Sequence, residues 1–221
     1  MFQTLQTALK GPAQAWAQHR QLVKGYTGIE SGLAAIQSVC AAPKDDSSAP
    51  IFLLSAGWRS GSTLLQRLIM SDKRVLIWGE PYDECGPIQA MADTLKAFRP
   101  GWPPAEYFYD GTPPGQLTGS WVANLFPAPD ALWQAHRQFH DALFDAPATQ
   151  AGAARWGIKE VRLGIEHARY LRWLYPNARF VLLYRNPLEA YRSYCRYGRS
   201  WYDTFPDKPV FTPATFGAHW R

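Results

Sequence analysis

Residues 51–69 constrain the fold of this 221-residue chain more than any other stretch. Ile51 to Leu54 is a short, unbroken apolar run, which is typical of a strand buried on both faces of a parallel sheet. Residues 55–63 are small or hydroxyl-bearing, apart from Trp58 and Arg59. Apolar residues then recur at helical spacing, at Leu64, Leu65, Leu68 and Ile69. The order predicts a strand, a tight loop and a helix.

The predicted loop has the composition of an anion site. Gly57 and Gly61 let a ligand approach the backbone, and the first N–H groups of the following helix point towards it. Arg59 adds a planar cation, and nearby hydroxyl groups add donors. The P-loop pattern G-x-x-x-x-G-K-[ST] would place a Lys where Ser62 stands. The loop is predicted to bind phosphate or sulfate, and a tight turn without a ligand is the alternative.

Two motifs carry a resemblance to a known family. Residues 59–65, RSGSTLL, resemble the loop with which sulfotransferases hold the 5′-phosphosulfate of 3′-phosphoadenosine 5′-phosphosulfate (PAPS). A second apolar run, Phe180 to Tyr184, precedes Arg185, and Ser193 follows eight residues later. In that family an Arg at the end of this strand and a Ser on the next helix hold the 3′-phosphate. The resemblance covers about residues 51–197.

The resemblance implies roles for individual residues. It implies a PAPS site made of Arg59, Ser60, Gly61, Ser62, Thr63, Leu64, Arg185 and Ser193. Glu80 is similar to the catalytic carboxylate of tyrosylprotein and carbohydrate sulfotransferases, which follows the next strand in a Gly-Glu context. Lys159 is similar in placement to a lysine near the transferring group of tyrosylprotein members, although those carry K-D-P where this chain has Lys159-Glu160-Val161. On the residues alone, the alternatives are that Glu80 pairs with a cation or caps a helix, and that Lys159 is a surface lysine.

The implied activity is transfer of a sulfuryl group from PAPS to an acceptor hydroxyl, leaving adenosine 3′,5′-bisphosphate and requiring no metal. Glu80 would take the proton, while Arg59 and Lys159 would stabilise charge near the sulfuryl group. The acceptor stays open among lipid, carbohydrate, peptide and small metabolite. A P-loop kinase is one alternative, and a non-catalytic protein that binds anions or nucleic acid is another.

The remaining pattern predicts an α/β fold in which a parallel sheet is flanked by helices around a P-loop-like sulfotransferase core. Alternating strands and helices predict parallel pairing with right-handed crossovers. Further strands are expected at 75–78, 156–159 and 180–184, and helices at 88–98, 131–144, 165–175 and 188–197. The carboxyl ends of the strands should bring Glu80 near Arg59.

Length and a hydrophobic content of 47% predict one domain spanning residues 1–221. Its expected parts are an N-terminal helical region (1–50), the phosphosulfate segment with the carboxylate (51–80), a helical and loop region for the acceptor (83–154), the 3′-phosphate segment (155–199) and an incomplete C-terminal region (200–221). The aromatic loop at 99–116 is expected either to bind the acceptor or to anchor the core.

Positive charge is concentrated at residues 155–199, which hold ten Lys or Arg and three Glu, a net +7 against +5 for the whole chain. Such a segment favours a multiply anionic ligand, although a nucleic-acid surface or solvated helix faces would give the same count. We expect no nucleic-acid partner. Arg162, Arg169 and Arg172 are expected to be solvated.

Other features exclude several classes. Three scattered cysteines, Cys40, Cys85 and Cys195, predict buried free thiols and no disulfide framework. His136 and His140 lack the Glu of H-E-x-x-H, so no metal site is expected. No apolar window approaches the length of about 20 residues of a membrane helix, and a cytoplasmic location is expected.

The C-terminal end departs from the family pattern. Thr212-Pro213 predicts a helix start, and the sequence stops at Arg221. Sulfotransferases continue with more helices and a basic loop that closes on the nucleotide. A fragment, a shortened homologue and a relative that binds nucleotide poorly all fit this ending.

Overall fold

The computed structural model describes residues 28–40, 49–81, 85–196 and 212–218. The chain divides into two compact units, Met1–Ala41 with Ala92–Pro129, and Ala42–Met91 with Asp130–Arg221. All the residues with a predicted role in chemistry belong to the second unit. The expectation of one domain over the whole chain stays a prediction.

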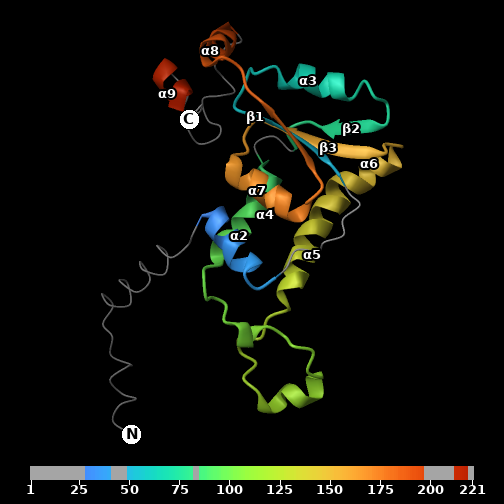
Figure 1. The fold of residues 1–221 in the computed structure, drawn as a ribbon, viewed down its shortest axis with the longest axis vertical. Coiled ribbons are helices and arrows are strands. Elements are labelled where there is room, and N and C mark those ends of the chain that lie inside the picture. Colours follow the sequence, from blue (N-terminus) through green and yellow to red (C-terminus); the bar gives the residue numbers. More distant parts are fainter. Residues whose placement is uncertain (1–27, 41–48, 82–84, 197–211, 219–221) are drawn as a thin grey trace. The chain divides into compact units, whose positions relative to one another are not determined.

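A four-stranded parallel sheet forms the centre of the second unit (Figure 1). Its strands are β1 (Ile51–Ser55), β2 (Val75–Trp78), β3 (Arg155–Glu160) and β4 (Arg179–Leu183). They lie in the order β2-β3-β1-β4, and every neighbouring pair is parallel. This arrangement confirms the predicted α/β fold, with each strand within two residues of its predicted bounds.

Helices cover both faces of the sheet (Figure 1). On one face lies α3 (Ser62–Ile69), which Gln66 fixes to β2 by donating from Nε2 to the Ile77 carbonyl at 2.8 Å. The opposite face carries α5 (Pro129–His140), a π-helix labelled η5 (Asp141–Asp145), α6 (Ala146–Gln150) and α7 (Ile165–Leu174). Among its described residues, this unit also contains α4 (Pro87–Asp93), of which residues up to Met91 belong to it, α8 (Pro187–Arg196) and α9 (Pro213–Ala218).

Aromatic packing joins β1 and β3 to the helices on the second face. The ring of Phe52 on β1 lies 6.0 Å from that of Trp156 on β3 and 5.8 Å from that of Tyr175, after α7. The Trp156 ring also stacks on Phe144 at 6.0 Å. A Cβ at Gly157 would lie 2.1 Å from the Ile51 carbonyl oxygen, so only glycine allows β1 and β3 to pack this closely.

The first unit is described by itself. Its described part contains α2 (Ile29–Gln37) and the 3₁₀ helices η2 (Thr94–Ala97), η3 (Ala105–Tyr107) and η4 (Pro114–Gly119). The predicted loop at 99–116 therefore holds short helical turns, and a bridge joins Phe108 to Phe126. The helix predicted at 88–98 ends as η2 because its last turn adopts 3₁₀ geometry.

Two predictions from composition are wrong in part. The Arg162 side chain is only 1% exposed because it pairs with Glu160, whereas Arg169 and Arg172 are exposed as expected. Cys40 is buried, but Cys85 and Cys195 are exposed free thiols. The predicted N-terminal helix before residue 28 and the predicted loop at 201–211 lie outside the described residues.

Candidate functional site

The carboxyl ends of the four parallel strands meet at one edge of the sheet and bring the predicted site residues into a row. The order of the strands in the sheet determines the order of these residues along the edge. Glu80 follows β2, Lys159 lies in β3, the loop at 56–61 follows β1, and Arg185 follows β4. The loop therefore lies between the Glu80 and Lys159 side of the edge and the Arg185 side.

The loop after β1 is a tight turn with two residues in the left-handed region. Arg59 has φ 60° and Gly61 has φ 95°. A positive φ is common for glycine but unfavourable for arginine, and such conformations occur preferentially at ligand sites. The buried Ser55 hydroxyl stabilises the turn through hydrogen bonds to the Gly57 carbonyl, at 2.9 Å, and to the Ser60 hydroxyl.

The amino end of α3 faces this turn. Gly61 is its N-cap, and the first amides bonded within the helix are those of Leu64 and Leu65, which donate to the Gly61 carbonyl at 3.0 and 3.1 Å. The amides of Ser62 and Thr63 precede these bonds and lie at the positive end of the helix dipole. This is the backbone arrangement that binds phosphate and sulfate groups in proteins.

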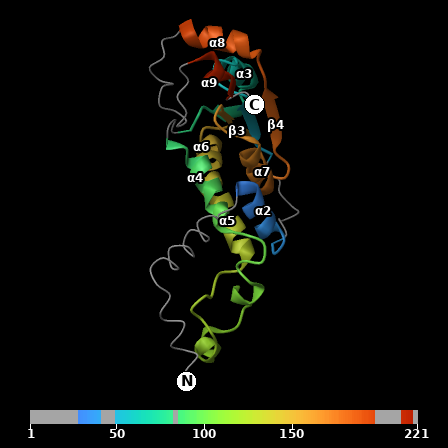
Figure 2. The same cartoon turned by 90° about the vertical axis from the view of Figure 1, so that its left-hand side faces the viewer.

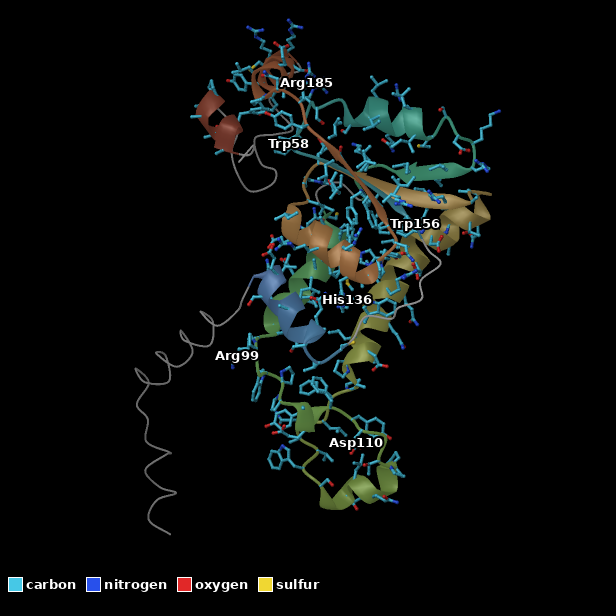
Figure 3. All side chains as sticks on the ribbon, viewed as in Figure 1. Trp58, Arg99, Asp110, His136, Trp156 and Arg185 are labelled. Atoms are coloured by element: carbon cyan, nitrogen blue, oxygen red, sulfur yellow. The ribbon has the colours of Figure 1, made fainter. Side chains whose placement is uncertain are left out.

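Arg59 and Arg185 converge from opposite ends of the sequence. Arg59 Nε donates to the Ser193 hydroxyl on α8 at 3.1 Å, and Arg185 Nη1 donates to the Arg59 carbonyl oxygen at 2.8 Å. Trp58 packs beside Tyr191 against the buried cluster of Ala190, Tyr194 and Phe216, which joins the loop to α8 and α9. Figure 3 shows Trp58 and Arg185 at the end of the unit that carries α8, and Figure 2 shows α8 and α9 side by side there.

Lys159 and Glu80 form the second polar group of the edge. The Lys159 ammonium donates to the Glu80 carboxylate across the pair β2 and β3. The Lys159 side chain is 6% exposed, whereas Glu80 is 30% exposed. The lysine is therefore enclosed, and the carboxylate keeps one side open to a ligand.

A protein-family model matches this chain. The model described as "Sulfotransferase family" matches residues 50–215, which is most of the sequence. The chain belongs to the sulfotransferase family. No curated protein and no solved structure matches it. The matched residues include the loop after β1, the Glu80 and Lys159 pair, Arg185 and Ser193.

In this family member, hydrogen bonds join several of the predicted site residues into two groups. Arg59, Arg185 and Ser193 are linked by hydrogen bonds, and Glu80 is linked to Lys159. Glu80 pairs with Lys159 on the adjacent strand, and the expectation that Glu80 lies near Arg59 stays a prediction. Within the loop, Ser60 and Ser62 are buried, while Gly61, Thr63 and Leu64 are exposed.

Sequence reasoning missed an ion pair that supports Lys159. Glu160 accepts from Arg162 Nε at 2.7 Å and Nη2 at 2.8 Å, and from the Val161 amide at 2.8 Å. Both side chains are only 1% exposed. The pair fixes the turn that directly follows β3, the strand in which Lys159 lies. Two opposite charges separated by one residue were the only sequence signal.

Two absences concern the described residues alone. No group of three or more His, Cys, Asp or Glu among them could hold a metal ion. His136 and His140 instead make internal contacts, His136 Nδ1 to the Tyr170 hydroxyl at 2.9 Å and His140 Nδ1 to the His136 carbonyl at 2.8 Å. In the same part of the chain, no helix combines the length and the apolar character that crossing a bilayer requires.

Proposed function

We propose that this protein transfers a sulfuryl group from PAPS to an acceptor hydroxyl. One observation carries the proposal: a strained, glycine-capped loop separates a hydrogen-bonded cluster of two arginines and a serine from a lysine–carboxylate pair. The first group suits a doubly charged phosphate, and the second suits proton removal beside a cation. A sulfuryl group held at the loop would lie between them.

The nucleotide would be held at two points. The 5′-phosphosulfate would bind the amides of Ser62 and Thr63 and the guanidinium of Arg59. The 3′-phosphate would bind Arg185 and the Ser193 hydroxyl. Because Arg59 already donates to Ser193 and accepts from Arg185, a change at one of these residues would disturb both phosphate positions.

The reaction would be an in-line displacement at sulfur. The acceptor oxygen forms a new bond to sulfur, and the bond from sulfur to the bridging oxygen of the 5′-phosphate breaks. Glu80 takes the proton of the acceptor hydroxyl and later releases it to water. Lys159 and Arg59 stabilise the negative charge that develops on the bridging and sulfuryl oxygens. The products are a sulfate ester and adenosine 3′,5′-bisphosphate.

This proposal is tested by calorimetric titration of the full chain with adenosine 3′,5′-bisphosphate, with AMP and magnesium–ATP as controls. Turnover with PAPS is then measured. Hydrogen bonds to charged groups contribute about 1.5–3 kcal/mol, and about 1.4 kcal/mol corresponds to a tenfold change in affinity. We therefore expect the bisphosphate to bind at least about tenfold more tightly than AMP. Equal affinity for both, or magnesium-dependent preference for ATP, would overturn the proposal.

A further inference from the structure

The second unit contains a cavity of about 360 Å³, part of whose lining comes from residues next to Glu80 in the chain. Gly79 and Pro81, the two residues that flank Glu80 in the chain, both line it. Its other lining residues are Trp78 at the end of β2, Leu143 and Phe144 in η5, and Pro147 in α6. The cavity is within the size range of small-molecule sites, about 300–1,000 Å³.

The side chains that line the cavity are apolar apart from one nitrogen atom. The only side-chain polar atom among these residues is Trp78 Nε1, and it already donates to the Phe144 carbonyl at 3.0 Å. A sugar placed here would lose hydrogen bonds to water and gain none from the lining side chains, which is costly. A flat, apolar body would instead pack against two aromatic rings, those of Trp78 and Phe144.

The wall formed by Leu143 and Phe144 is held rigidly. These residues lie in the π-helix, a conformation that is rare and is found frequently at functional sites. At its start, Asp141 accepts from the Tyr175 hydroxyl at 2.7 Å and from Arg137 Nε at 2.8 Å. At its end, the Phe144 carbonyl accepts from Trp78. The cavity wall is therefore connected to β2, the strand that leads directly to Glu80.

We propose that this cavity binds the body of the acceptor and that the acceptor is a phenol. The inference rests on the proposed function and specifies its substrate. The ring lies between Trp78, Leu143 and Phe144, and the hydroxyl is directed towards Glu80, which stands between the lining residues Gly79 and Pro81 in the chain. The phenol oxygen forms the bond to sulfur, its proton passes to Glu80, and an aryl sulfate leaves with adenosine 3′,5′-bisphosphate. A free phenol and a tyrosine side chain share this chemistry.

The test compares Leu143→Trp with Ala142→Trp. The first substitution fills the cavity, whereas the second places the same side chain at the neighbouring exposed position of the π-helix, away from the lining. Calorimetry measures binding of 2-naphthol and of adenosine 3′,5′-bisphosphate to each full-length variant. Turnover with PAPS is measured with 2-naphthol, a tyrosine-containing peptide and the disaccharide trehalose.

We expect 2-naphthol binding, and the KM for whichever phenol is used, to worsen at least about tenfold in Leu143→Trp. Ala142→Trp should behave as the unaltered protein, and both variants should keep their affinity for the bisphosphate. Preference for 2-naphthol over the peptide identifies a free phenol, and the reverse identifies tyrosine. Turnover of trehalose but neither phenol, or an unchanged 2-naphthol affinity in Leu143→Trp, overturns this inference while leaving the proposed function standing.

The outcomes also separate the two proposals. If the unaltered protein does not bind adenosine 3′,5′-bisphosphate, the proposed function is overturned, and the proposed acceptor role of the cavity with it. Cavity-dependent binding of 2-naphthol without turnover of any acceptor shows a phenol site and overturns its role in sulfuryl transfer.

Discussion

Lys159 donates a hydrogen bond to Glu80 from the adjacent strand, and the lysine is enclosed while the carboxylate is partly open. Glu80 follows β2 and Lys159 lies in β3, so the two charges meet because these strands are neighbours in the sheet. The pairing holds the Glu80 carboxylate at the edge of the sheet, and its proposed role as a general base requires such a fixed position.

Replacement of this carboxylate should separate chemistry from binding. We expect Glu80→Gln to lower kcat by about 10²–10⁴-fold, the usual contribution of a general base. Affinity for adenosine 3′,5′-bisphosphate should stay nearly unchanged, because the proposed phosphate contacts lie on the other side of the loop. Single-turnover kinetics and calorimetry measure the two effects. Glu166→Gln, at the start of α7, is the matched control. A large loss of affinity with normal turnover would contradict the role of Glu80 as base.

Substitutions at the arginine cluster should instead change nucleotide selectivity. Ser193→Ala removes the hydroxyl that accepts from Arg59, and Arg185→Ala removes a cation and the bond to the Arg59 carbonyl. We expect the preference for adenosine 3′,5′-bisphosphate over AMP to fall by about tenfold in Arg185→Ala, and less in Ser193→Ala, because a charged partner contributes more than a neutral one.

Competition calorimetry with both nucleotides measures this ratio. Arg192→Ala is the control, since this arginine lies on the same helix but is 72% exposed in a surface pair with Glu189. If Arg185→Ala and Arg192→Ala lose affinity for both nucleotides equally and Ser193→Ala loses none, general positive charge explains binding and a defined 3′-phosphate site does not.

The buried Glu160 and Arg162 pair should matter for stability and for the position of Lys159. Glu160→Gln leaves a buried guanidinium without its counter-charge, and breaking such a pair costs about 3–5 kcal/mol. Urea unfolding measures the loss. The exposed pair of Glu189 and Arg192 gives a matched control, because Glu189→Gln should change stability by no more than about 1 kcal/mol. Equal effects of the two substitutions would show that burial does not strengthen the first pair.

The sequence and the structure agree best where one physical signal dominates. Short apolar runs such as Ile51 to Leu54 predicted the strands because a buried parallel strand needs apolar residues on both faces. Thr212 was predicted to cap a helix, and its hydroxyl accepts from the Thr215 amide at 3.2 Å. Such signals depend on residues that are close in the chain, so the corresponding structure can be predicted from the sequence.

Features that depend on distant residues could not be predicted. The cavity combines residues 78–81 with 143–147, and nothing in either stretch indicates the other. The family resemblance assigned Arg59 and Arg185 to one site, but neither stretch indicates the hydrogen bond between these two residues, which are 126 positions apart. Arg162 was misjudged because a cation next to a turn is usually solvated, and only the fold buries it against Glu160.

Acid should destabilise the protein through His140. This side chain is fully buried, and burial lowers its pKa from an ordinary 6.5 to about 4. Between these two values the unfolded chain binds a proton that the native protein does not, so stability falls as the pH decreases from 6.5 to 4. A shift of this size corresponds to about 3 kcal/mol at most. His140 also packs against Phe144 in the cavity wall, at 6.1 Å between ring centroids.

The variant His140→Phe keeps an aromatic ring and removes the titrating group. Urea unfolding at several pH values should therefore give a shallower dependence on pH in the variant than in the unaltered protein. His136, whose pKa burial also lowers, is present in both proteins. The comparison uses the slope with pH, so a uniform loss of stability in His140→Phe does not affect it, and His140→Asn repeats the test with a polar side chain. Parallel slopes in all three proteins would show that His140 is not the group that acid titrates.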